Sequence, residues 1–151
     1  MRKKYWHKWV LIIGIGLVLS CGDIPTCVDT ETNRVKIDFL DANGNAADIF
    51  LIKLKAIGNE DGFPEYDDDT LSSISLSLNP AASVTTFIFE QTTGTDTLGL
   101  SYAVVAKLIS PECGLDAAFD NMDTTFTSFN KLIILESTIH EDILTNIEII
   151  L

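Results

Sequence analysis

The residues best suited to acid–base chemistry lie near the carboxyl end of the chain. His140 is followed directly by Glu141 and Asp142, and Glu136 lies four residues before it. Neighbouring carboxylates raise the pKa of a histidine and so make its neutral form a stronger base. His140 could therefore act as a general base. The chain carries no Gly-x-Ser-x-Gly sequence that would supply a serine nucleophile. We therefore interpret His140 as a turn residue. A hydrolase with a concave pocket lined by His140 and one of these carboxylates is kept as an alternative.

Two carboxylate-bearing segments could bind a divalent cation. Calcium needs six to eight oxygens from a tightly curved loop. Segment 41–48 starts with Asp41 but has glycine fourth, not sixth as in a helix–loop–helix calcium site, so a hairpin turn is favoured. The acidic loop Gly58–Asp69 ends in Asp67, Asp68 and Asp69, and is interpreted as a solvated loop. We expect no cofactor. A protein that carries a small ligand or a divalent cation such as calcium, bound by these four aspartates, is kept as a second alternative.

The first twenty residues have the pattern of an export signal. Four basic residues precede an apolar run from Val10 to Leu19. As a helix this run would rise only about 15 Å, roughly half the hydrocarbon core of a bilayer. A basic head and a short apolar middle are typical of a secretory signal peptide. We therefore expect residues 1–20 to be removed from the mature protein.

The end of this leader carries a thiol that could be lipidated. It reads Val18-Leu19-Ser20-Cys21, which resembles the lipobox of bacterial lipoproteins, where a peptidase cuts before the cysteine and lipid is attached to its thiol. The resemblance implies that Cys21 is the first mature residue. Acyl chains such as palmitate on Cys21 would anchor the protein without a spanning helix. An uncleaved membrane anchor with a stray cysteine is the alternative.

Cys27 and Cys113 then remain as an even pair. Export beyond the cytoplasm permits disulfides, so we predict a bridge between Cys27 and Cys113. The loop that it closes spans about 86 residues, for which the chain-entropy relation gives roughly 4.5 kcal/mol. A metal or redox role is disfavoured, because the chain has no Cys-x-x-Cys and its mature part has one histidine.

Composition bounds the class of protein. The 151 residues suit one domain, and 46% of them are hydrophobic, which excludes wholesale disorder. The formal net charge is -12. It becomes -16 without the leader, because four of the ten basic residues lie there against no acidic one. Nucleic acid is therefore not expected as a partner, because phosphate backbones require a basic surface.

The hydrophobic pattern predicts an all-β fold. Alternation of apolar and polar residues recurs in short segments separated by turn residues, and no convincing amphipathic helix occurs. We predict about seven strands, within residues 34–40, 48–57, 71–78, 84–90, 98–108, 126–137 and 143–151. The expected architecture is an antiparallel β-sandwich over residues 34–151, immunoglobulin-like or transthyretin-like, after a lipidated polar tether at 21–33. An up-and-down barrel is the runner-up.

Three details of this pattern are specific enough to test. The segments 34–40 and 48–57 are expected to form a hairpin or a closely linked pair. In the second segment, Phe50, Ile52, Leu54 and Ala56 are expected to face inward. Along 98–108 every second residue from Leu98 to Leu108 is expected inward, and 116–123 is expected to be one helical turn or an irregular loop.

Three segments together resemble a known group of proteins. They are Cys-Gly-Asp-Ile-Pro-Thr-Cys at 21–27, Ser-Pro-Glu-Cys-Gly at 110–114 and the closing strand Asn146–Leu151. The chain resembles an uncharacterised family of small Bacteroidota lipoproteins, a domain of unknown function. The resemblance implies a lipid-anchored envelope protein with an immunoglobulin-like sandwich, a Cys27–Cys113 bridge and no enzymatic activity. Near the lipid cysteine only Asp23 is acidic, whereas surface export favours an acidic run there. We therefore expect attachment to the outer membrane, facing the periplasm.

These observations favour a non-catalytic binding or structural module of the cell envelope. Its expected partners are the membrane, through the lipid on Cys21, and another envelope protein such as an outer-membrane β-barrel. The edge strands and the acidic loop Gly58–Asp69 are the surfaces where we expect a partner to bind.

Overall fold

The computed structural model describes residues 34–59, 62–111, 114–139 and 144–151. These residues form nine strands and one short 3-10 helix, η1 (Pro64–Tyr66). None of their helical segments has the length and apolarity needed to cross a membrane. The strands are β1 (Arg34–Leu40), β2 (Ile49–Ala56), β3 (Asp69–Leu71), β4 (Ser73–Ser77), β5 (Val84–Gln91), β6 (Gly94–Ser110), β7 (Gly114–Thr127), β8 (Lys131–Ile134) and β9 (Ile147–Ile150).

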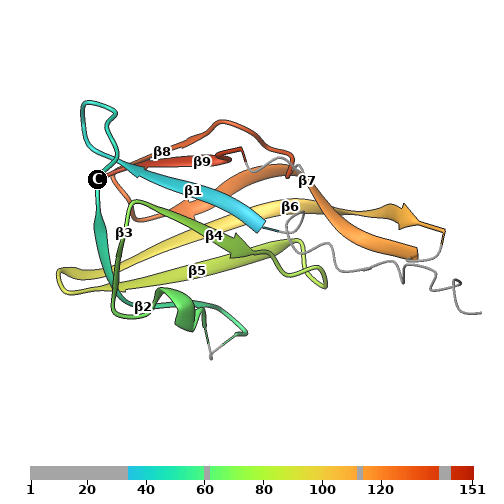
Figure 1. Cartoon of the computed structure of the whole chain (residues 1–151), viewed down its shortest axis with the longest axis horizontal. Coiled ribbons are helices and arrows are strands. Elements are labelled where there is room, and N and C mark those ends of the chain that lie inside the picture. Colours follow the sequence, from blue (N-terminus) through green and yellow to red (C-terminus); the bar gives the residue numbers. More distant parts are fainter. Residues whose placement is uncertain (1–33, 60–61, 112–113, 140–143) are drawn as a thin grey trace, which may run out of the picture.

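The strands form two sheets that pack as a sandwich, which confirms the predicted all-β fold (Figure 1). One sheet has the order β4-β1-β9-β8 and the other has the order β3-β2-β5-β6-β7. β1 pairs antiparallel with β4 and parallel with β9. In an immunoglobulin fold the first two strands share a sheet, whereas here β1 and β2 lie in different sheets.

The expected hairpin of residues 34–40 and 48–57 is therefore wrong. The turn after β1 is local: Ala46 bridges back to Leu40, and the Ala47 N–H donates to the Phe39 carbonyl at 3.0 Å. The chain then crosses to the other sheet. Alternation fixes which face of a strand is buried but carries no information about its neighbour, so the pairing was not accessible from the pattern.

The core lies between the two inner faces and is rich in aromatic and branched side chains. Phe39 of β1 meets Phe89 of β5 edge to face, with ring centroids 6.5 Å apart. Phe129 closes this cluster against Phe89 at 5.2 Å. Such geometry aligns the positive ring edge with the negative ring face. The largest fully buried side chains are Phe39, Phe87, Phe89, Phe119, Ile37, Leu51, Leu54, Ile74, Leu76, Leu98, Leu100 and Ile147.

A bulge in β2 changes which of its side chains face inward. The register against β5 shifts between Leu51 and Lys53. Upstream of the bulge Ile49 and Leu51 are buried, while Phe50 and Ile52 are each 41% exposed. The expected inward positions of Phe50 and Ile52 are therefore wrong, although Leu54 and Ala56 are buried as expected. One extra residue in a strand moves every side chain beyond it to the other face.

β6 and β7 form a long antiparallel hairpin that extends past the other strands (Figure 1). Residues 116–123 belong to β7, so the expected helical turn or irregular loop is wrong. The register shifts between Ser101 and Ala103, where Asn121 has a φ of 52°. β7 thus carries a bulge at the point where the hairpin leaves the sandwich, and bulges bend strands.

Candidate functional site at the Arg34 end of the sandwich

Several residues singled out by sequence lie outside the described residues. They are Cys21, Cys27, Cys113, His140, Glu141 and Asp142, together with the leader 1–20 and the tether 21–33. Glu136 is described, and its Oε1 accepts a hydrogen bond from the Thr138 N–H at 3.1 Å. That carboxylate therefore stabilises the turn after β8.

Asp41 holds the turn that follows β1. Its Oδ1 accepts hydrogen bonds from the backbone N–H groups of Asn43 at 2.8 Å and Asn45 at 2.9 Å. The Asn45 backbone N–H, helped by the Asn45 side-chain amide, lowers the pKa of Asp41. Gly44 follows with a φ of 84°, which a side chain would strain. The carboxylate therefore acts within a turn, which is the interpretation that the sequence favoured.

The other aspartates named as calcium candidates also bond to nearby backbone. Asp67 Oδ1 accepts from the Leu54 N–H at 3.2 Å, next to the β2 bulge. Asp69 Oδ1 accepts from the Thr70 N–H at 2.7 Å. Asp68 has a φ of 53°, and its N–H donates to the Ile52 carbonyl. Within the described part of the chain, no three His, Cys, Asp or Glu side chains gather in a way that could hold a metal ion.

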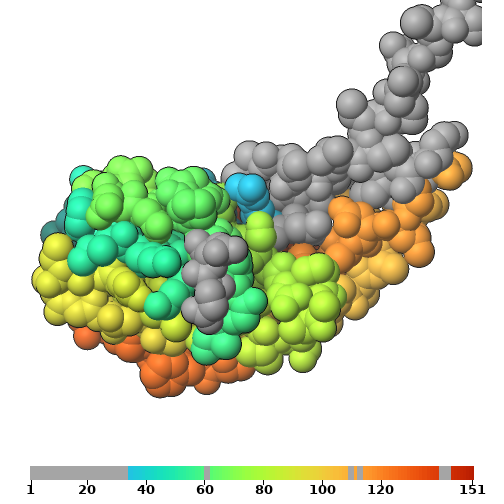
Figure 2. Space-filling view, turned by 90° about the horizontal axis from the view of Figure 1, so that it is seen from below, coloured from blue at the N-terminus to red at the C-terminus, as the bar shows by residue number. Residues whose placement is uncertain are grey.

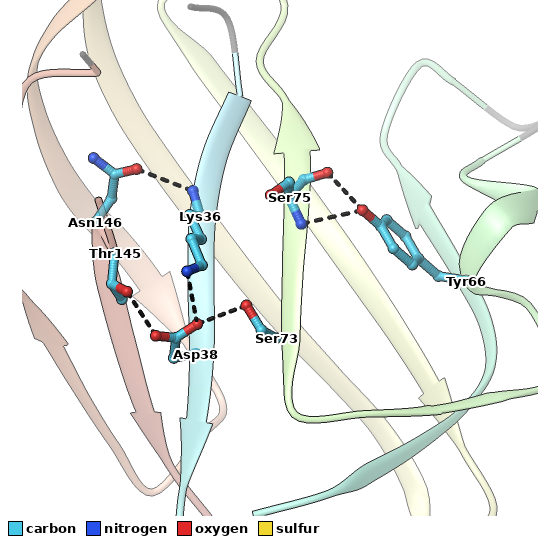
Figure 3. A network of polar contacts seen from close by, with 7 residues as sticks. All are labelled: Lys36, Asp38, Tyr66, Ser73, Ser75, Thr145 and Asn146. Atoms are coloured by element: carbon cyan, nitrogen blue, oxygen red, sulfur yellow. Dashed lines mark hydrogen bonds and ion pairs between the residues drawn. The ribbon is translucent and has the colours of Figure 1, made fainter. Parts of the chain in front are cut away.

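The edge strand β4 is one of the predicted partner surfaces. Its free edge is covered by a side chain from η1, the 3-10 helix between β2 and β3 of the other sheet. The Tyr66 hydroxyl in η1 accepts from the Ser75 N–H at 3.1 Å and donates to the Ser75 carbonyl at 2.9 Å (Figure 3). These are the backbone groups that β4 would offer to an added strand. Covering them protects the edge from pairing with other chains.

Asp38 ties three segments together on the outer face of the β1 sheet. Its carboxylate accepts hydrogen bonds from Ser73 Oγ on β4 and from Thr145 Oγ1 before β9, each at 2.6 Å (Figure 3). Lys36 Nζ lies 4.0 Å from the same carboxylate. All of these partners are protein groups, so the cluster fixes the strand order around β1.

The end of the sandwich where β1 begins is hollowed. Arg34 pairs with Ser77 of β4, and Val84 of β5 pairs with Ser101 of β6. Ser77 and Val84 line one pocket, so both sheets reach this end, which we call the Arg34 end. The pocket has a volume of about 240 Å³ and is lined by Ala56, Ile57, Gly58, Asn59, Phe63, Ser77, Leu78, Asn79, Val84 and Thr85.

A buried hydroxyl pair lies beneath this pocket. Thr85 Oγ1 and Tyr102 Oη are 2.6 Å apart, and both side chains are buried. The Asn79 N–H donates to both oxygens, and the Tyr102 hydroxyl bonds the Asn79 carbonyl at 2.9 Å. The hydroxyls therefore fix the turn between β4 and β5. Sequence reasoning placed Tyr102 inward but did not foresee this contact, which joins residues from three separate segments.

Beyond Tyr102, β6 and β7 continue as a two-stranded ribbon, which we define as residues 103–110 and 114–119. Figure 2 shows it extending from the rest of the molecule. Val104 and Val105 are 40% and 47% exposed, and the cross-strand partners Leu108 and Leu115 are 60% and 70% exposed. The expected inward positions of Val104, Ala106 and Leu108 are therefore wrong, because the core ends at Tyr102 and Phe119.

A second pocket lies at the opposite end of β1. It has a volume of about 220 Å³ and includes Phe129, Ile150 and Leu151. The Leu151 N–H donates to the Leu40 carbonyl at 2.9 Å, which places this pocket at the end of β1. Small-molecule sites are commonly about 300–1,000 Å³, so both hollows are small for such a ligand.

Comparison with known proteins identifies a family to which the chain belongs. No curated protein and no solved structure matches the chain. Residues 51–151 match a family of unknown function, DUF6452. This match begins within β2 and covers both pockets' strands, the ribbon and the final strand β9. The chain therefore belongs to DUF6452, a family of unknown function.

Proposed function

We propose that this chain is a lipid-anchored, non-catalytic binding or structural protein of the cell envelope, from a group of small Bacteroidota lipoproteins. The observation that carries the proposal is the sequence Val18-Leu19-Ser20-Cys21 after a basic head and a short apolar run. Each part has a chemical reason: a small residue fits the peptidase, and the thiol accepts the lipid. The mature protein is held at the outer membrane and faces the periplasm.

The geometry of the described residues supports a binding role exerted through surfaces. The two pockets are small, and the carboxylates of Asp41, Asp67 and Glu136 bond to nearby backbone N–H groups. The large exposed features are apolar side chains, and Glu65, Asp68 and Asp69 of the acidic loop are exposed as well. A surface of this kind suits another envelope protein, such as an outer-membrane β-barrel.

Metabolic labelling with a palmitate analogue tests the anchor. The full chain should incorporate the label, and Cys21→Ala should lose it. Cys27→Ala is the matched control, because it removes a thiol six residues away and should keep the label. The intact mass of the labelled protein should correspond to a chain that begins at Cys21 with its acyl groups. Label retained in Cys21→Ala, or a native chain that still carries residues 1–20, would contradict the proposal.

Membrane fractionation and crosslinking test the location and the partner. We expect the protein to separate with the outer membrane and to be protected from added protease in intact cells. A photo-crosslinker placed at Glu65, in the acidic loop, should capture an envelope protein, whereas one at Asn43 in the β1 turn is the control. If the crosslinker captures no envelope protein at either position, the proposed partner at the acidic loop is contradicted.

A further inference from the structure

Exposed apolar side chains concentrate at one end of the molecule. Twelve large hydrophobic side chains are exposed among the described residues. Two line the rim of the pocket at the Arg34 end, and four lie on the ribbon that leaves this end. They are Ile57, Val84, Val104, Val105, Leu108 and Leu115. Apolar side chains gathered in this way mark an interaction surface, because isolated ones are common but clusters are not.

Both faces of the ribbon carry apolar groups. Val104 and Val105 are consecutive in β6, so their side chains point to opposite faces of the ribbon. Leu108 lies on the Val104 face and opposite Leu115 of β7. The charged residues there, Lys107 and Asp116, are cross-strand partners of opposite sign. A flat protein surface would cover one face of such a ribbon, whereas lipid would surround both.

The position of the lipid-bearing cysteine favours lipid as the partner. Arg34, the first described residue, starts β1 at the same end from which the ribbon extends. Arg34 follows Cys21 by thirteen positions, a length of chain that spans at most about 45 Å. The ribbon from Ser101 to Ser110 extends about 30 Å from this end. The tether is therefore long enough for the lipid on Cys21 and the far end of the ribbon to reach the same membrane.

The predicted disulfide brings the ribbon still closer to the lipid. Cys113 lies outside the described residues, but in the sequence it falls between Ser110, the last residue of β6, and Gly114, the first residue of β7. A bridge from Cys113 to Cys27 would place Cys21 only six positions along the chain from the bridged cysteines. Six residues span at most about 20 Å.

We propose that the Arg34 end faces the membrane that holds the Cys21 acyl chains, and that the ribbon inserts Leu108, Leu115, Val104 and Val105 among the lipids. This inference rests on the proposed lipid anchor. The formal net charge of -16 without the leader disfavours attraction to anionic headgroups, so apolar insertion carries the contact. Neutral phosphatidylcholine is therefore the matching lipid.

Tryptophan fluorescence tests the insertion, because both native tryptophans, Trp6 and Trp9, lie in the leader. In a full chain carrying Trp6→Phe and Trp9→Phe, one variant adds Leu115→Trp and the control adds Leu151→Trp. Leu151 is also exposed, at 44%, but lies at the opposite end of β1. The exported proteins are reconstituted in phosphatidylcholine vesicles with brominated acyl chains, which quench neighbouring tryptophans.

We expect a blue shift and at least about twofold stronger quenching at position 115 than at position 151. Leu108→Asp puts a carboxylate directly opposite position 115 and should reduce that quenching, whereas Leu135→Asp should not. Solvent-like emission without quenching at position 115 would overturn the inference. A blue shift without lipid quenching would also overturn it, because the side chain would then be covered by a second copy or another protein.

The same samples separate this inference from the proposed function. Intact mass reports whether Cys21 carries acyl chains, and bromine quenching reports whether the ribbon meets lipid. Acylated protein without quenching at position 115 keeps the anchor and overturns the ribbon insertion. Protein without acyl chains overturns the anchor, and its quenching in the same vesicles still decides whether the ribbon enters lipid.

Discussion

Asn146 holds Lys36 through two hydrogen bonds, one from each residue. The Asn146 N–H donates to the Lys36 carbonyl at 2.9 Å, and the Lys36 N–H donates to Asn146 Oδ1 at 3.0 Å. The amide side chain thereby extends the parallel pairing of β1 with β9 by one residue beyond Ile37 and Ile147. Asn146 is only 4% exposed, and its side-chain amide also donates to the carbonyls of Glu136 and Thr138, each at 3.4 Å.

Asn146→Ala should destabilise the fold by about 1–3 kcal/mol, because the Lys36 N–H would be left without its acceptor in a partly buried site. Asn130→Ala, at an exposed position, is the control and should change stability by less than about 0.5 kcal/mol. Urea unfolding of the two variants measures both values. Equal midpoints for the wild type and Asn146→Ala would show that the second bond to Lys36 contributes nothing.

The hydroxyl pair beneath the Arg34-end pocket should be energetically coupled. Tyr102→Phe removes an oxygen that contacts both Thr85 and Asn79, and should cost about 1–2 kcal/mol. Thr85→Val removes the partner hydroxyl. Because the two groups share Asn79, the double variant should lose less than the sum, with a coupling of about 0.5–1.5 kcal/mol. Additive losses in a double-mutant cycle would contradict a shared network.

Gly99 is required by the close approach of β7. A Cβ at this position would lie 2.5 Å from Thr125 Oγ1, at the point where the β6–β7 register shifts. Gly99→Ala should therefore destabilise the protein by about 1–3 kcal/mol. Adding Thr125→Ala removes the clashing oxygen and should restore most of the loss. Thermal unfolding compares the three variants, and a double variant no more stable than Gly99→Ala would place the strain elsewhere.

Strand positions were predictable where local chemistry alone defines them. β1 was predicted with its observed bounds, because Val35, Ile37 and Phe39 alternate with polar residues and Asp41 begins a turn. The polar segment 116–123 was not recognised as a strand. Phe119 and Met122 are three residues apart, and the bulge at Asn121 brings both into the core. A bulge breaks the alternation on which strand prediction depends.

The arrangement of the candidate surfaces was not predictable, because it depends on which segments become neighbours. The pairing of β1 with β9 joins residues about 110 positions apart, as the contact between Lys36 and Asn146 does. The cluster at the Arg34 end likewise combines Ile57, Val84 and Leu115 from three strands or their ends. By contrast, the role of Asp41 in a turn followed from neighbouring residues and was predicted.

Asp41 should make stability depend on pH. Hydrogen bonds from Asn45 and Asn43 lower the pKa of Asp41 in the folded protein. A lowered folded pKa means that the charged form stabilises the fold above the unfolded pKa, and that this contribution is lost as the pH falls through the folded pKa. Asp41→Asn should therefore be less stable than the wild type at pH 7, with a difference that shrinks below about pH 4. Urea unfolding of both proteins at pH 7 and below about pH 4 measures the stability difference. A difference that does not change with pH would contradict the prediction.

The predicted Cys27–Cys113 bridge should stabilise the exported protein substantially. Both cysteines lie outside the described residues, but Cys113 directly precedes Gly114, the first residue of β7. Closing a loop of about 86 residues should contribute roughly 4.5 kcal/mol by restricting the unfolded chain. Cys27→Ser and Cys113→Ser should therefore each lower the unfolding midpoint equally, and the double variant should lower it no further. Unequal single losses, or free thiols at both positions in the native protein, would show that the two cysteines are not bonded to each other.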